Sequence, residues 1–442
     1  MCSLYIPRHS AALPYNPPLM TSGRPTFRSH LTLALCMLLH AFTHAFVAAL
    51  IPLYLLIRDD LHLAGVKPVA LIVSVYGMVY FLASYPAGML ADRFNRKMLL
   101  GVGLIGNACC ILLMGLTHQY WPLLGLGIMA GLFGTLFHPA ANALAPAHYP
   151  NAPGMALGIL GIGSGVGFFV GAQYSGWRAQ TLGHTIGGLS RWQVPCVEMG
   201  LAGIVFGVLF LLVAREAPHV TTIRRDAVPM PRGTRRLTLG IALLSGCRDF
   251  AGVGMMSLLS IYLQKAHAYD PRQTGWIIGA MGLLSIIATP LGVWATSGRR
   301  RLPGLATCMI VAGLILATIP IIPLAWLLVV LTVFSIFHLG SYSISEVSVI
   351  ERVGPDVRGR VMGLYLTLAG TMGAVAPWII GFWTDRLGAR SNEPGSYIPV
   401  FAVLALLMMF GATATRLLSR LGRPQAVTPL DLAQAAPESE PL

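Results

Sequence analysis

The chain has 442 residues, of which 55% are hydrophobic and only 10% are charged, and its mean hydropathy is +0.70. Soluble domains carry about 25% charged residues, so this composition excludes a soluble globular protein. One helical crossing of a bilayer needs about 20 apolar residues, and roughly twelve crossings with short loops would use up the chain. No room remains for a separate soluble catalytic domain, so we expect a lipid bilayer as partner. The formal charge of +14 is only weak evidence for nucleic acid, which we do not expect as a partner.

The hydropathy pattern predicts an all-α, polytopic membrane protein with twelve transmembrane helices. Each predicted span is a run of mostly apolar residues that is long enough to cross the hydrocarbon core. The predicted spans cover residues 31–57, 69–90, 98–117, 121–143, 155–176, 195–214, 237–263, 274–296, 303–323, 325–347, 360–383 and 397–418.

The distribution of basic residues predicts how the chain is oriented and divided. Of the 30 Lys and Arg residues, 21 lie in one alternating set of loops together with both termini. Positive charge is retained on the cytoplasmic side, so we expect both termini in the cytoplasm and the chain in the inner membrane. The predicted divisions are a disordered N-terminus (1–30), a six-helix bundle (31–214), a basic cytoplasmic linker (215–236), a second six-helix bundle (237–418) and a cytoplasmic tail (419–442).

Three short sequence matches relate the two halves. The Pro-Ala-Gly of 86–88 returns as Pro-Leu-Gly at 290–292, Phe-His at 137–138 returns at 337–338, and a Gly-x-x-x-Gly at 154–158 returns at 359–363. The matches keep their order at offsets of 200 to 205 residues. They indicate two pseudo-symmetric bundles with a site between them, an arrangement typical of secondary transporters.

The junction between the second and third spans carries the most specific motif. Residues 88–97 read GMLADRFNRK and resemble the G-x-L-x-D-R-x-G-R-[RK] signature of the major facilitator superfamily, with Asn95 in place of the second glycine. We expect Asn95 to keep the turn, because Asn tolerates a left-handed backbone. The resemblance implies a conformational latch between the bundles, formed by Gly88, Asp92, Arg93, Arg96 and Lys97. In it, Asp92 would cap a neighbouring helix N-terminus and the basic residues would pair across the interface.

A thinner resemblance points to one branch of that superfamily. The triplet Phe137-His138-Pro139, together with His40 and an ionisable residue four positions later, is similar to the fosmidomycin-resistance exporters. The branch has Asp where this chain has His44, and an acidic residue where this chain has Ala140. The resemblance implies drug efflux.

Ionisable residues deep inside the spans are candidates for a functional site, because they are expensive to insert. They fall on spans one, four, seven and ten, the helices that surround the central cavity in the superfamily that the chain resembles. This candidate substrate and proton-coupling site comprises His40, His44, His138, Arg248, Asp249, His338 and Glu346.

The spacing of the candidate residues along each helix predicts which of them share a face and which need other partners. His40 and His44 lie one helical turn apart on one face, and an unperturbed histidine pKa of about 6.5 suits proton exchange as well as simple cavity lining. Arg248 and Asp249 are adjacent and diverge by about 100°, so we expect each to have another partner. For Asp249 this would be a cavity histidine, and for Arg248 an anionic substrate or Glu346. An inter-bundle salt bridge is the alternative. Pro139 predicts a kink beside His138. The glycines between 161 and 171 favour close helix packing.

These features favour a proton-coupled secondary active transporter that moves a small molecule or drug by alternating access, and the resemblance to the resistance branch implies that it exports it. We expect a monomer that uses the proton gradient and needs no cofactor. No Walker loop, G-x-S-x-G, H-E-x-x-H or dinucleotide motif occurs, so an enzyme is not expected. One alternative is proton-coupled uptake of a small organic anion. Another is a membrane-embedded metal-binding enzyme or sensor, although no metal is expected, because the four histidines come from three helices and need not converge.

Overall fold

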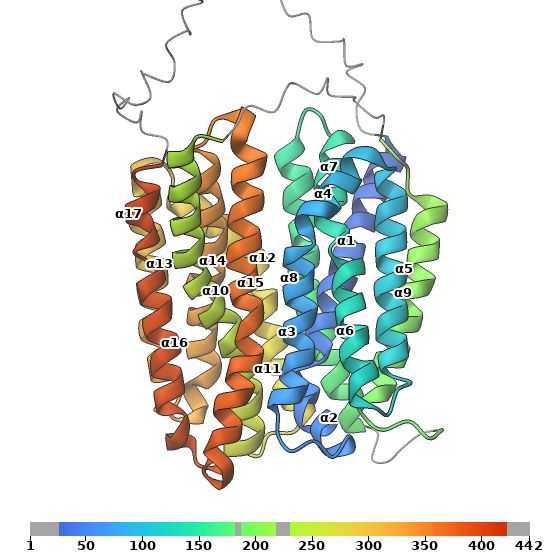
Figure 1. Cartoon of the computed structure of the whole chain (residues 1–442), viewed down its shortest axis with the longest axis vertical. Helices are drawn as coiled ribbons and strands as arrows, with labels where there is room; N and C mark the ends of the chain where they lie inside the picture. The colour runs from blue at the N-terminus through green and yellow to red at the C-terminus, as the bar shows by residue number, and fades with distance from the viewer. Residues whose placement is uncertain (1–25, 182–186, 218–229, 422–442) are drawn as a thin grey trace, which may run out of the picture.

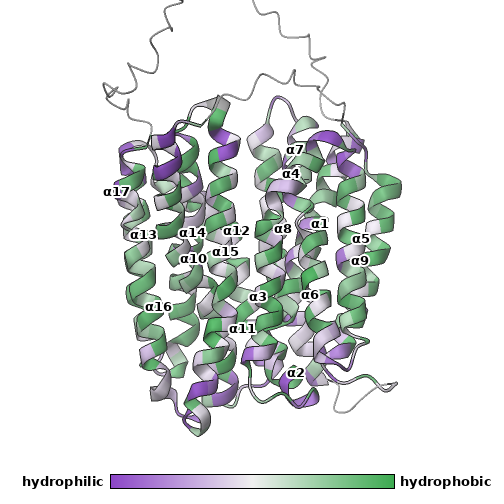
Figure 2. Cartoon of the chain, viewed as in Figure 1, coloured by the Kyte–Doolittle hydropathy of each residue, from purple (hydrophilic) through white to green (hydrophobic). Residues whose placement is uncertain are grey.

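A computed structural model describes residues 26–181, 187–217 and 230–421, and these residues form helices and turns without a strand. Residues 1–25 of the predicted disordered N-terminus, and most of the predicted linker and tail, lie outside the described residues. Residues 27–30 are helical and begin α1, so the prediction of disorder is wrong for these four. Within the described part of the chain, eleven helical segments are long and apolar enough to cross a membrane, and a bent pair of helices brings the number to twelve. Apolar residues form a broad band around the middle of the molecule, while hydrophilic residues gather at its two ends (Figure 2). The prediction of an all-α polytopic membrane protein is confirmed.

The first half of the chain supplies the helices on the right of Figure 1. These elements are α1 (Phe27–Ala49), η1 (Ile51–Leu53), α2 (Tyr54–Asp60), α3 (Lys67–Leu82), α4 (Ser84–Arg93), α5 (Arg96–Met114), α6 (Tyr120–Gly134), α7 (Phe137–Ala147), α8 (Pro153–Thr181) and α9 (Gln193–Val213).

The second half supplies the helices on the left of Figure 1. These elements are α10 (Arg232–Ala266), α11 (Pro271–Leu283), α12 (Ser285–Ala295), η2 (Gly298–Arg300), α13 (Arg301–Thr318), η3 (Leu324–Trp326), α14 (Leu327–Ile350), α15 (Pro355–Leu387), η4 (Gly388–Asn392), η5 (Pro394–Tyr397), α16 (Ile398–Gly411) and α17 (Ala414–Leu418).

Several predicted spans are broken rather than continuous. The first is divided into α1, η1 and α2, and the second bends by 47° between α3 and α4. The corresponding span of the second half is divided between α11 and α12, so the two halves share an interruption in their second span. This shared interruption adds a structural likeness to the sequence matches between the halves.

The fourth span is interrupted near the predicted place, but not at Pro139 itself. The chain leaves the helix after Gly134, and α7 starts at Phe137, so Pro139 lies in the first turn of α7. A proline is tolerated there because first-turn amide groups have no partner within the helix. The matching tenth span has Leu339 and Gly340 after its histidine, and α14 runs through without a break.

The two halves are joined at one end of the molecule. We call the end that carries residues 93–96 and 214–217 the linker side. The other end of the molecule carries η1, α2 and the start of α3, and we call it the opposite side. On the opposite side, the hydroxyl of Ser260 donates to the carbonyl of Ile51 at 2.7 Å, and the side chain of Gln264 donates to the carbonyl of Pro52 at 3.2 Å. Nearer the middle, the amide of Trp378 donates to the Ser74 hydroxyl at 3.0 Å.

Glycines of both halves border open space on the linker side. A methyl group added at Gly88, Gly158 or Gly359 would meet no atom within 4 Å. In contrast, a methyl group at Gly176 or Gly275, on the opposite side, would overlap the backbone of the other half. The described structure is therefore closed on the opposite side and more open on the linker side.

Candidate functional site

Two histidines of α1 form the centre of a cluster in the first half. His40 is buried, and its Nδ1 lies 2.7 Å from the carbonyl oxygen of Leu160 on α8. Its Nε2 lies 3.0 Å from Nε2 of His44. The predicted common face of the two residues is thus confirmed, and their rings are in direct hydrogen-bond contact.

The break in the fourth span brings His138 to the same place. Its ring meets the ring of His40 edge-on with centroids 5.1 Å apart, while Phe137 stacks flat on His40 at 4.5 Å. The ligand nitrogens of His40, His44 and His138 all lie within 4.8 Å of one another. The expectation that the histidines need not converge is therefore wrong for these three. It failed because the spacing of residues along one helix does not reveal which way a second helix faces.

Glycines on α8 hold that helix close to α1 and so place the carbonyl that His40 contacts. Added methyl groups at Gly163, Gly167 and Gly171 would overlap the backbone carbonyls of Met37, Ala41 and Ala45, respectively. Only residues without a side chain allow such an approach. The prediction that the glycines between 161 and 171 serve close packing is confirmed for these three, whereas Gly161 borders open space.

In the second half, Arg248 and Asp249 of α10 pair with each other. The Arg248 Nε and Nη2 atoms lie 2.8 and 2.7 Å from Oδ1 of Asp249, and the Arg248 and Asp249 side chains are 2% and 11% exposed. The expectation that the two residues do not pair with each other is therefore wrong, although Arg248 also has a further partner on α14. Although the two Cβ atoms diverge, the long arginine side chain curls back, and its planar guanidinium presents two donors to one carboxylate oxygen.

The remaining surface of the Arg248 guanidinium is also engaged. Its Nη1 donates to the carbonyl of Ser341 on α14 at 3.0 Å, and its carbon atom lies 4.0 Å from the centre of the Tyr342 ring. A buried charge needs such compensation. Glu346, the partner proposed from the sequence, forms no ion pair with Arg248 among the described residues. Sequence analysis missed Tyr342, although its position one turn after His338 on α14 was a usable signal.

His338 lies beside this ion pair, and both His338 and Arg248 contact Tyr342. Its ring stacks on Phe334 at 5.1 Å and meets Tyr342 edge-on at 5.1 Å, and an added methyl at Gly252 would overlap it. Its Nδ1 is buried without a hydrogen-bond partner among the described residues. The seven candidates therefore form two groups: one of three histidines in the first half, and one around Arg248 in the second.

The motif at residues 88–97 adopts a different local structure from the expected one. Asn95 has φ −58°, not a left-handed conformation, and its side chain caps α5 by accepting from the amide of Met98 at 2.8 Å. Asp92 and Arg93 are exposed, and Asp92 caps no neighbouring helix among the described residues. Lys97 uses its backbone amide to bind Glu216 at 2.8 Å. The expected latch is not formed in this conformation, which is consistent with the wider spacing on the linker side.

A carboxylate caps a helix of the other half on the opposite side instead. Asp385, near the end of α15, accepts hydrogen bonds from the amides of Val66 and Lys67, at 2.7 and 2.8 Å. These amides lie at the N-terminus of α3, where the helix dipole favours negative charge. Sequence analysis did not identify Asp385, because its partner lies more than 300 residues away in the chain.

Asp385→Ala is expected to open the opposite side. The change removes two charge-assisted hydrogen bonds of about 1.5–3 kcal/mol each, so the ratio of closed to open molecules should fall by about tenfold or more. The distance between spin labels at Asp59 and Arg390, both exposed, reports this change in a cysteine-free background. Asp270→Ala is the matched control, because Asp270 caps its own helix α11. An unchanged label distance in Asp385→Ala would show that this cap does not hold the halves together.

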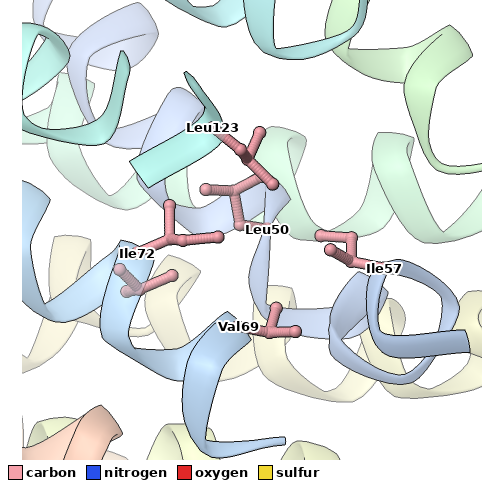
Figure 3. Close-up of a pocket in the computed structure, with 6 residues that line it drawn as sticks. Leu50, Ile57, Val69, Ile72 and Leu123 are labelled. Carbon is pink, nitrogen blue, oxygen red and sulfur yellow. The ribbon is translucent and has the colours of Figure 1, made fainter. Parts of the chain in front are cut away.

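A small void near the break after α1 is not a substrate site. It measures about 10 Å³ and is lined only by Leu50, Ile57, Val69, Ile72, Val73 and Leu123. Figure 3 shows these aliphatic side chains facing one another around it. The void is barely large enough for one water molecule and offers no polar partner, so it is a packing defect between α1, α2, α3 and α6.

The fold and the buried ionisable groups together define a multi-pass helical membrane protein built from two related halves. A model of the Major Facilitator Superfamily matches residues 33–377 and, in a second match, 241–437. The chain belongs to this superfamily of transporters, and the resemblance seen in residues 88–97 is confirmed.

Similar proteins agree with the family. Multidrug resistance protein MdtH of Shigella dysenteriae serotype 1 (strain Sd197) is 25% identical over 353 residues, covering 75% of this chain and 83% of the relative. MdtH of Escherichia coli (strain SMS-3-5 / SECEC) is 25% identical over 351 residues, with the same coverage.

Two crystal structures share the fold. Both are of a bacterial homolog to the human lysosomal transporter Spinster in an inward-facing conformation. The unoccupied form has a TM-score of 0.75 at 16% identity and covers 91% of this chain and 100% of that one. The occupied form has a TM-score of 0.74 at 17% identity and covers 90% and 98%.

Proposed function

We propose that this chain is a proton-coupled exporter of small molecules or drugs that works by alternating access in the inner membrane, as a monomer with both termini in the cytoplasm. The observation that carries the proposal is the unequal spacing of the two halves. They are hydrogen-bonded on the opposite side and spaced apart on the linker side, as one state of a rocking transporter requires. The basic loops favour the cytoplasm for the linker side, so this state would open inward.

Proton coupling is supported by the buried ionisable groups. The Arg248–Asp249 pair lies within an apolar span of the second half, and the histidine cluster lies within apolar spans of the first half. Ionisable groups are costly to insert there, so their presence indicates a function. No cofactor is needed in this scheme, because the proton gradient supplies the energy. The proposed latch residues would engage only when the linker side closes.

Export rather than uptake is supported by the state of Arg248 and by the relatives. Uptake of an organic anion was suggested by Arg248 and the histidines in an otherwise apolar cavity, but the Arg248 guanidinium is occupied by Asp249, Ser341 and Tyr342. The MdtH proteins are named for multidrug resistance, which agrees with efflux.

Accumulation of radiolabelled compounds in cells tests the direction. The panel comprises phosphonates, lipophilic drugs and small carboxylates, in a host that lacks its own exporters. Cells that produce the protein should accumulate less of at least one compound, and a protonophore should abolish the difference. Higher accumulation would establish uptake. No difference with any compound, in cells that contain the folded protein, would contradict the proposal.

A further inference from the structure

The three histidines that converge in the first half have the arrangement of a metal site. We propose that His40, His44 and His138 bind a divalent transition-metal ion such as Zn²⁺. Two of the ligands are four residues apart on one face of α1, the spacing by which paired helical histidines bind zinc, and the third enters from the first turn of α7. This revises the expectation from the sequence that no metal is bound.

The distances fit three ligands of one ion. Nε2 of His40 and Nε2 of His44 are 3.0 Å apart, and a ring nitrogen of His138 completes a set within 4.8 Å. Zinc binds imidazole nitrogen at about 2.0–2.1 Å, so neighbouring ligand atoms of a tetrahedral site lie a little over 3 Å apart. Small side-chain rotations of His138 would therefore complete the set.

The surroundings of His40 also prepare it as a ligand. A carbonyl oxygen only accepts, so Nδ1 of His40 carries the proton that it donates to Leu160. Neutral His40 therefore presents the lone pair of Nε2 to the cluster. A histidine that binds a metal through one ring nitrogen usually donates the N–H of its other nitrogen to a carbonyl or carboxylate oxygen. The stacked Phe137 ring also fixes the orientation of the His40 imidazole.

The ligand set predicts which ions bind and how. Imidazole suits zinc, copper and nickel, and three protein ligands leave a fourth position open to water or an anion. Because the three ligands are neutral, the ion keeps its positive charge, and binding should be weaker than at thiolate-rich structural sites. His44 and His138 are only half-buried, which leaves the cluster reachable.

The site lies within one half of the molecule. His40 and His44 lie on α1, His138 on α7 and Leu160 on α8, so none of the ligands depends on the second half. Metal binding should therefore persist in a variant that does not transport. A failure of the proposed transport function would leave this proposal standing. A metal ion on the histidines would leave the Arg248–Asp249 pair to carry proton coupling.

Calorimetric titration of the purified full-length protein, without a polyhistidine tag, with Zn²⁺ at neutral pH tests the proposal. We expect one ion per chain, with affinity reduced at least tenfold in His138→Gln and in His44→Gln. His338→Gln is the matched control, a histidine of the second half that lies outside the cluster, and it should bind as the wild type does. Co²⁺ in place of Zn²⁺ should give the intense visible absorption of a tetrahedral nitrogen site.

The proposal would be overturned by the absence of saturable binding to the wild type, or by equal binding by the wild type and either cluster variant. Equal losses in His338→Gln and the cluster variants would also contradict it, by placing the effect outside the three histidines. If either His44→Gln or His138→Gln does not fold, the other variant still tests the proposal.

Discussion

Asp249→Asn should destabilise the protein more than any other single change at the candidate site. The substitution leaves the Arg248 guanidinium, on a side chain only 2% exposed, without its carboxylate. Removing one member of a buried ion pair costs about 3–5 kcal/mol, because the other charge stays buried. Thermal unfolding in detergent, followed by the loss of monodisperse protein, should show a marked fall in the midpoint.

The double variant Arg248→Met/Asp249→Asn is the control for that prediction. It removes both charges, and apolar replacement of a buried pair is often close to neutral in stability. We therefore expect its midpoint to return towards that of the wild type. A single variant as stable as the wild type would show that the pair carries little buried charge. Equal losses in the single and double variants would assign the effect to packing.

Gly167→Leu should prevent α8 from packing against α1. The first atom of the new side chain would overlap the carbonyl oxygen of Ala41, and a helix backbone cannot move aside as a flexible side chain does. Overpacking of a core costs about 1–3 kcal/mol and sometimes more, and we expect the upper end of this range. The amount of folded protein recovered from the membrane should fall sharply.

Gly158→Leu on the same helix is the matched control, because an added Cβ there meets no atom within 4 Å. It should be recovered as well as the wild type, since leucine also favours the helix more than glycine does. If Gly167→Leu and Gly158→Leu were recovered equally, the close contact between α1 and α8 would not matter for folding.

The general architecture was predictable because it depends on local composition. Each span was visible as an apolar run, and the basic motif after the second span identified the superfamily. The breaks were less predictable, because a proline such as Pro139 can lie inside a kink or in the first turn of a new helix. The sequence alone does not distinguish these two cases.

The sequence identified the residues of the candidate site, but it did not predict which of them contact one another. Charges within apolar spans marked His40, Arg248 and Asp249, since burial of such groups is costly wherever they point. Their partners depend on side-chain reach and helix orientation, which is why the Arg248–Asp249 pair was missed. The cap of α3 by Asp385 depends on contact between the halves, and no local pattern reveals it.

The proton flux that accompanies transport tests the central claim most directly. Intraliposomal pH is followed with a reporter dye in proteoliposomes during challenge with phosphonates, lipophilic drugs and small carboxylates, in the wild type and in Arg248→Met/Asp249→Asn. We predict a compound-dependent proton flux in the wild type that is lost in the double variant, although that variant is folded. Transport of a labelled compound by the wild type without any proton flux would contradict proton-coupled export.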